Sequence, residues 1–66
     1  MSKIKYPRIS VKFEDGENAA GIIARTQKAL RRAGVLPDVI ERYRAEATAS
    51  DYDNVIETTE RWVNTD

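Results

Sequence analysis

The sequence contains no cysteine and no histidine. The absence of cysteine excludes disulfide bonds, thiolate nucleophiles and thiolate metal ligands, and with them a secreted scaffold held together by disulfides. The absence of histidine removes the commonest general base and the commonest metal ligand. Any proton transfer would have to use carboxylates, lysine or tyrosine. We therefore expect a protein that is not an enzyme and that binds no metal and no cofactor.

Long apolar stretches are also missing. No stretch approaches the roughly 20 apolar residues of a membrane-spanning helix, and residues 1–7 lack the apolar run of a secretion signal. Of the 66 residues, 33% are charged and 41% are hydrophobic, which is the balance of a globular chain. We expect a single domain over residues 1–66, located in the cytoplasm and without contact to a membrane.

A β-strand is predicted over residues 8–14, where apolar and polar side chains alternate. The apolar side of this strand contains Ile9, Val11 and Phe13. Asp15 and Gly16 follow, and this dipeptide favours a turn in which glycine tolerates a positive φ. The strand is therefore expected to end just before this turn.

Three amphipathic helices are predicted over residues 19–33, 37–48 and 51–63. Their apolar stripes are, in order, Ala19, Ile22, Ile23, Thr26, Leu30 and Ala33; then Leu36, Ile40, Tyr43 and Ala47; then Tyr52, Val55, Ile56, Thr59, Trp62 and Val63. The predicted fold is α+β and mostly α, with one N-terminal strand followed by three helices (β-α-α-α).

The ends of these helices have recognisable signals. Asn18 is a good N-cap for the first helix, and Gly34 suits the left-handed position after its end. Pro37 suits the first turn of the second helix, because its missing N–H would have no partner there. Ser50, with Asp53 three residues later, is predicted to begin the third helix with a capping box.

A single strand leaves backbone groups without partners, unless residues 61–65 leave the third helix to join it. We therefore expect a partner strand, supplied by a second copy of the chain about a two-fold axis or by a target protein whose sheet the strand extends. Alternatively, the segment is an arm that packs over the helices. Trp62 is either an interface anchor or a core residue. The expected edge of a homodimer or complex consists of Ile9, Val11, Phe13 and Trp62.

Charge is divided unevenly along the chain although the formal net charge is zero. Residues 1–33 carry eight Lys or Arg against three Asp or Glu, a net charge of +5, whereas residues 34–66 carry three against eight, a net charge of −5. The candidate contacts for a phosphate group or an acidic partner are Arg25, Lys28, Arg31 and Arg32. The candidate contacts for a basic partner are Asp51, Asp53, Glu57 and Glu60. The alternative is that both sets form solvated helix faces.

Residues 29–43, from Ala29 to Tyr43, resemble a degenerate helix-turn-helix, because Gly34 would stand in a short turn between two helices. The second helix opens with Pro37 and Asp38, which disfavours contact with base edges, where cationic or amide side chains are needed. Binding of DNA or a nucleotide is therefore an alternative function.

A further set of features resembles a group of small uncharacterised proteins from bacteriophages, prophages and some bacteria. These features are Asn18-Ala19, Ile22-Ile23 with Arg25, Ala29-Leu30-Arg31-Arg32-Ala33-Gly34-Val35, Glu46-Ala47-Thr48, Asp51-Tyr52-Asp53 and Arg61-Trp62-Val63. The resemblance covers most of residues 9–63 and departs at Ser50 and at the Ala20-Gly21 pair. It implies no activity, but it implies a mobile-element protein that acts in the cytoplasm of a host cell by binding a host or defence protein.

The leading hypothesis from the sequence is a small non-enzymatic protein-interaction module. It would act as a homodimer that binds, and inhibits or modulates, a host or defence protein. The alternatives are the DNA- or nucleotide-binding module described above and a structural or assembly component of a phage particle.

Overall fold

The computed structural model describes residues 4–14 and 16–65. The elements follow in the order β1 (Tyr6–Ser10), α1 (Ala19–Arg32), α2 (Pro37–Ala47), α3 (Tyr52–Trp62) and β2 (Val63–Asn64). This order confirms the mostly helical α+β fold, with one N-terminal strand followed by three helices. Asp15 of the predicted turn lies outside the described residues, as do residues 1–3 of the N-terminal segment that lacks the apolar run of a secretion signal.

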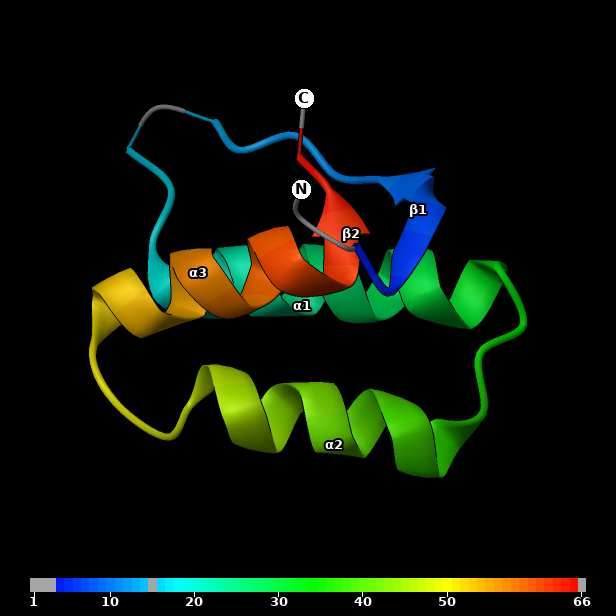
Figure 1. The fold of residues 1–66 in the computed structure, drawn as a ribbon. Coiled ribbons are helices and arrows are strands. Elements are labelled where there is room, and N and C mark those ends of the chain that lie inside the picture. Colours follow the sequence, from blue (N-terminus) through cyan, green and yellow to red (C-terminus); the bar gives the residue numbers. More distant parts are fainter. Residues whose placement is uncertain (1–3, 15, 66) are drawn as a thin grey trace.

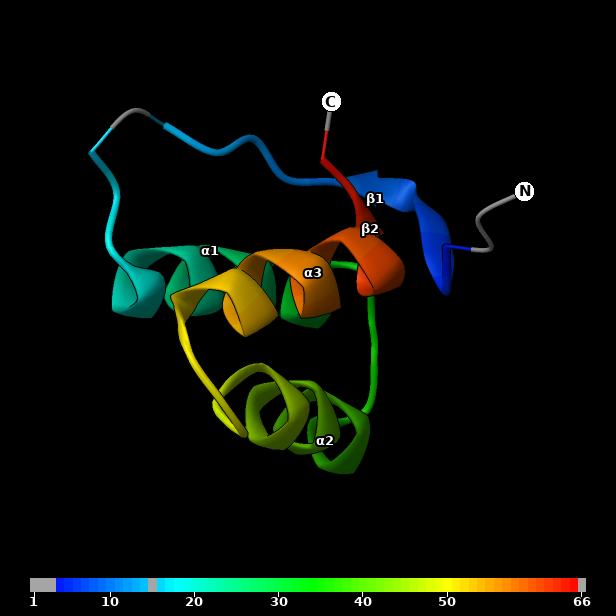
Figure 2. The same cartoon turned by 60° about the vertical axis from the view of Figure 1, so that its left-hand side comes forward.

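The elements form three layers (Figures 1 and 2). The two strands lie on one side of α1 and α3, and α2 lies on the other side. The main hydrophobic cluster is built from all three layers and contains Val11, Leu30, Ile40, Tyr43, Ala47, Trp62 and Val63. Each layer is therefore held to the next by buried apolar side chains.

The strand β1 has a partner within the same chain. It pairs in parallel with β2, with Tyr6 opposite Val63 and Ser10 opposite Asn64. The N–H of Val11 also donates to the carbonyl of Asn64, at 2.8 Å. The chain thus leaves the third helix after Trp62 and supplies the second strand itself, so the expectation of a partner strand from another molecule is wrong for this edge.

The predicted strand boundaries, residues 8–14, are also wrong, because β1 begins two residues earlier, at Tyr6, and ends at Ser10, where its pairing with Asn64 of β2 ends. The alternation of side chains correctly indicates which residues face inward: Val11 is buried, and Ile9 and Phe13 are half-buried. Tyr6 also faces inward, but an irregular register between Tyr6 and Ser10 places Pro7 and Arg8 together at the surface and breaks the two-residue period there.

Helix ends agree with the predicted ranges within one residue, but one predicted cap is wrong. Asn18 caps α1 by accepting a hydrogen bond from the N–H of Gly21, at 2.8 Å. The N-cap of α3 is Asp51, whose carboxylate accepts from the N–H of Asn54 at 3.1 Å, and Ser50 lies one residue before this cap. An aspartate accepts this bond as well as a serine does, so either residue satisfies the sequence signal.

A buried polar contact joins α2 to α3. The hydroxyl groups of Tyr43 and Thr59 lie 2.7 Å apart, and both side chains are fully buried. Because the Thr59 hydroxyl donates its only proton to the carbonyl of Val55, at 2.8 Å, Tyr43 is the donor in this contact. No buried side-chain nitrogen or oxygen in the described ranges lacks a hydrogen-bond partner.

Three residues on the predicted buried stripes, Ala33, Leu36 and Tyr52, are exposed. Leu36 has 64% of its surface accessible and Tyr52 has 48%. Leu36 precedes the first turn of α2 and has extended backbone angles, so the projection of a helix does not apply to it. Tyr52 is the first residue of α3, and its hydroxyl donates to the carbonyl of Glu17, at 3.2 Å, outside the main cluster.

Candidate interaction surface

A groove of about 530 Å³ lies between β1 and the turn that joins α1 to α2, and it is lined by residues 5–9, residues 33–36 and Val39. Figure 1 shows β1 and this turn at the same end of the molecule. We refer to this feature as the basic groove, because its lining contains Lys5 and Arg8 and no acidic side chain. Its volume lies within the range of about 300–1,000 Å³ that is typical of binding pockets.

The turn between α1 and α2, which lines one side of the groove, is a Schellman motif, and this motif fixes the backbone of the turn. Gly34 has φ of +87°, its N–H donates to the carbonyl of Arg31, and the N–H of Val35 donates to the carbonyl of Leu30, both at 3.1 Å. A residue with a Cβ at position 34 would be strained by this positive φ. The backbone therefore holds Val35 and Leu36 in a defined position beside β1.

Leu36 is the most exposed large apolar side chain among the described residues. It occupies the N-cap position of α2, where no side-chain hydrogen bond is made to the helix. Aspartate, asparagine and serine are strongly preferred at this position, and leucine is among the poorest residues there. Leu36 is therefore unfavourable for the stability of the fold in two ways. Its apolar side chain is exposed to solvent, and it does not cap α2.

Lys5 is held in place by contacts with the end of α3. Its Nζ lies 4.3 Å from the ring centroid of Trp62, and its backbone N–H donates to the carbonyl of Arg61, at 2.9 Å. Tyr6 packs on the same tryptophan, with 6.0 Å between ring centroids. A cation over an indole ring is attracted by its negative face. One cation of the groove is thus oriented by the core before any partner arrives.

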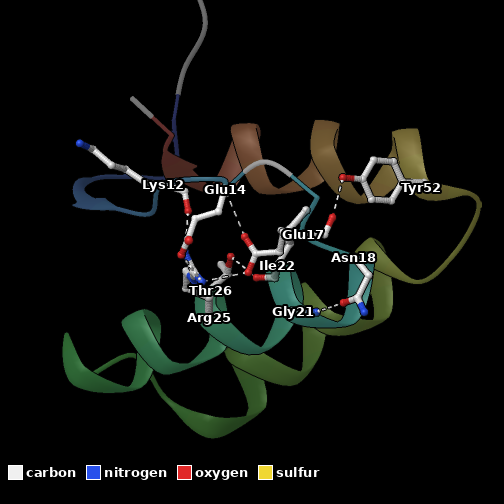
Figure 3. A network of polar contacts seen from close by, with 9 residues as sticks. All are labelled: Lys12, Glu14, Glu17, Asn18, Gly21, Ile22, Arg25, Thr26 and Tyr52. Carbon is white, nitrogen blue, oxygen red and sulfur yellow. Dashed lines mark hydrogen bonds and ion pairs between the residues drawn. The ribbon is translucent and has the colours of Figure 1, made fainter.

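Arg25, one of the four predicted cationic contacts, is committed to the segment between β1 and α1 (Figure 3). Its Nη2 lies 2.9 Å from Oε1 of Glu14 and 3.1 Å from Oε2 of Glu17, and its Nη1 donates to the carbonyl of Lys12, at 3.1 Å. Arg25 therefore closes a polar network over the start of α1. The remaining predicted cations, all exposed on α1, are Lys28, Arg31 and Arg32.

The predicted carboxylates lie on α3, and one of them has a structural role. Asp51 is the N-cap of that helix. The exposed carboxylates that remain are Asp53, Glu57 and Glu60. Tyr52 stands between two aspartates and contacts Glu17, which in turn accepts a hydrogen bond on its side chain from the N–H of Glu14. We refer to Glu14, Glu17, Asp51, Tyr52 and Asp53 as the acidic end.

The residues predicted to form a partner edge are not exposed together. Val11 and Trp62 have 4% and 2% of their surface accessible, because the pairing of β1 with β2 places both in the hydrophobic cluster. Trp62 also donates from Nε1 to the carboxylate of Glu46, at 3.1 Å. Ile9 and Phe13 are half-buried, and of the four predicted edge residues only Ile9 lines the basic groove.

The sequence patterns did not predict that the other side chains of this groove form a candidate binding surface. Lys5 and Tyr6 precede the predicted strand, and Arg8 was assigned no role within it. Leu36 was assigned to a buried stripe. A signal for Leu36 was present, because a leucine directly before Pro37 stands at an N-cap, outside the helical period.

Two other kinds of site are absent from the part of the chain that the structure describes. Over residues 4–14 and 16–65, no helix is long and apolar enough to cross a bilayer. In the same ranges, no group of three or more acidic residues is placed to hold a metal ion. Comparisons with known protein families, curated proteins and solved structures gave no match to this chain.

Proposed function

We propose that this protein acts by binding another protein, and that the basic groove receives a partner segment in which acidic residues flank a large apolar side chain. The observation that carries the proposal is Leu36. A leucine that is 64% exposed and stands at an uncapped helix start is unfavourable for folding. Departures of this kind from local folding rules are expected at functional positions.

The chemistry of the groove supports an acidic partner. Its apolar floor includes Tyr6, Ile9 and Val35, which pack against the hydrophobic cluster, while Lys5 and Arg8 provide positive charge without a carboxylate in the lining. Complementary charge steers association and fixes orientation, while the apolar contact supplies most of the affinity. An extended acidic segment with one apolar anchor matches both features.

The kind of protein that presents such a segment follows from the phage resemblance. A host or defence protein is the partner that we propose, with inhibition or modulation as the outcome. The unpaired strand was the reason to expect a homodimer formed by strand pairing. That reason no longer applies, because β2 already pairs with one edge of β1. The groove, and not an unpaired strand, is the surface on which the proposal rests.

The proposal is tested by calorimetric titration with three synthetic peptides. Each carries the same single Phe anchor, flanked by Glu, by Gln or by Lys. We expect the Glu peptide to bind tightest and its affinity to fall as salt is raised. Arg8→Glu should weaken the Glu peptide about tenfold, or about 1.4 kcal/mol, and Leu36→Ser should cost about 2 kcal/mol, as expected for a central apolar contact.

A matched control separates the groove from general electrostatic attraction. Lys28→Glu makes the same change of charge at an exposed position of α1 that does not line the groove. It should leave the affinity within about twofold of the unchanged protein, since an exposed charge outside the contact is largely screened. Equal losses in Arg8→Glu and Lys28→Glu, or no preference among the three peptides, would overturn the proposal.

A further inference from the structure

We infer that a second copy of this chain is one partner of the basic groove, and that it enters with Tyr52 of its acidic end. This inference rests on the proposed function, because it assigns an occupant to the same groove. Leu36 and Tyr52 are the large apolar side chains that the fold leaves exposed in the described part of the chain. One of them lies in the basic groove and the other in the acidic end.

The charges around these two side chains are complementary. Tyr52 stands between Asp51 and Asp53. Glu14 and Glu17 of the acidic end are paired with Arg25, so the negative charge offered to a partner comes from the two aspartates. The groove around Leu36 carries Lys5 and Arg8 and no carboxylate. Docking of one surface on the other would bury both exposed apolar side chains and bring opposite charges together, which is the combination that a specific interface requires.

Tyr52 is held ready for this contact. Its hydroxyl donates to the carbonyl of Glu17, at 3.2 Å, so the ring is fixed at its far end. Figure 3 shows the ring beyond the polar network of Arg25, with its hydroxyl turned toward Glu17. A ring that is already oriented loses little conformational freedom on docking.

The two surfaces lie at opposite ends of the molecule. Figures 1 and 2 show the start of α3 at one end and the turn between α1 and α2 at the other. A contact between two different surfaces is heterologous, and each copy that joins presents a free groove and a free acidic end. Association would therefore proceed head to tail, into a ring or an open chain of copies.

The test is a concentration series by light scattering after size-exclusion chromatography at low salt. The unchanged protein should exceed the mass of a monomer at high concentration and return to it when salt is raised. Leu36→Ser should be monomeric because its groove is impaired, and Tyr52→Ser should be monomeric because its acidic end is impaired. Mixed in equal amounts, these two variants should form a complex of two chains that grows no further, because each supplies the surface that the other lacks.

One conservative variant serves as the control for head-to-tail association. Tyr52→Phe keeps the apolar ring and should still associate, and circular dichroism should show all variants folded. A wild-type monomer at every concentration would overturn the inference, as would association retained in Tyr52→Ser or a mixture that stays monomeric. In any of these cases, binding of the Glu peptide by the unchanged protein would leave the proposed function standing.

Discussion

At the residue scale, Leu36 is unfavourable for folding but favourable for the proposed binding. Pro37 fixes the start of α2, and the residue before it takes extended angles, with φ of −65° and ψ of 146°. That geometry is suited to a capping side chain, yet Leu36 offers none. The groove gains an apolar contact from this residue, and the helix lacks a side-chain cap.

Replacement of Leu36 by aspartate should therefore stabilise the fold. A new cap on α2 is expected to raise the free energy of unfolding by about 1 kcal/mol, while the same change should abolish binding of the Glu peptide by removing the apolar contact and adding a like charge. Urea denaturation followed by circular dichroism measures the stability. Leu36→Ala is the control, because it removes the leucine without adding a cap. An aspartate variant no more stable than the alanine variant would contradict the prediction that a missing N-cap at position 36 lowers the stability of the fold.

The contact between Tyr43 and Thr59 makes a second prediction at this scale. Tyr43→Phe removes a donor and leaves no buried donor unpaired, so it should cost only about 0.5–1.5 kcal/mol. Thr59→Val leaves the Tyr43 hydroxyl buried without its partner and should cost about 1–3 kcal/mol. The double variant should be more stable than Thr59→Val alone. Additive losses in this double-mutant cycle, measured by urea denaturation, would contradict the assigned contact.

At the element scale, the segment between β1 and α1 depends on one arginine. Arg25 reaches both Glu14 and Glu17 and also the backbone carbonyl of Lys12. These bonds tie the segment to α1 along a stretch where β1 has already ended. They are partly exposed, so their strength depends on salt.

Arg25→Met should loosen this segment without unfolding the domain. The expected loss of stability is about 1 kcal/mol or less, because the pairs are partly solvated. Hydrogen exchange should accelerate at the amide of Glu17, which donates to the carbonyl of Glu14 at 3.1 Å. Lys28→Met is the control and should leave that amide unchanged. The difference should shrink at high salt, and an Arg25→Met protein with unaltered exchange there would refute the assignment.

The elements themselves were largely predictable from the sequence, because local signals determine them. Asn18 and Gly34 marked helix ends through their own hydrogen bonding and φ angle, and the spacing of Ile22, Thr26 and Leu30 identified the buried face of α1. The strand β2 was harder to predict, because Val63 continues the apolar stripe of the third helix and leaves the helix only to pair with β1.

The candidate site could be predicted much less well than the fold. Its lining joins residues 5–9 to residues 33–36, and no periodicity links segments so distant in the chain. The irregular register of β1 also places Tyr6 inward and Pro7 outward, against a simple alternation. Leu36 and Tyr52 were assigned to buried stripes because a helical projection was extended to the very ends of α2 and α3, where the fold leaves both side chains exposed.

At the scale of the whole molecule, the basic end of α1 and the acidic start of α3 lie at opposite ends of the fold. The last turn of α1 carries Arg31 and Arg32 at the end that holds the basic groove, whereas α3 starts at the opposite end with Asp51 and Asp53. These charges also complement the helix dipoles, with cations near a C-terminus and carboxylates near an N-terminus. The same placement stabilises α1 and α3 and sets Arg31 and Arg32 at one end of the molecule and Asp51 and Asp53 at the other, while α2 runs the opposite way, with Asp38 in its first turn and Arg44 in its last.

The basic groove as a binding surface is tested most directly by amide chemical-shift mapping of the labelled protein, titrated with the Glu peptide at low protein concentration. The groove predicts that the largest shifts fall on the amides of residues 5–9 and 33–39, other than Pro7 and Pro37, which have no N–H. The side-chain N–H of Trp62 should respond through Lys5. Little change is expected at Lys28 or at Glu57. Shifts concentrated on the outer face of α1 or along α3, with residues 5–9 and 33–39 unaffected, would contradict it.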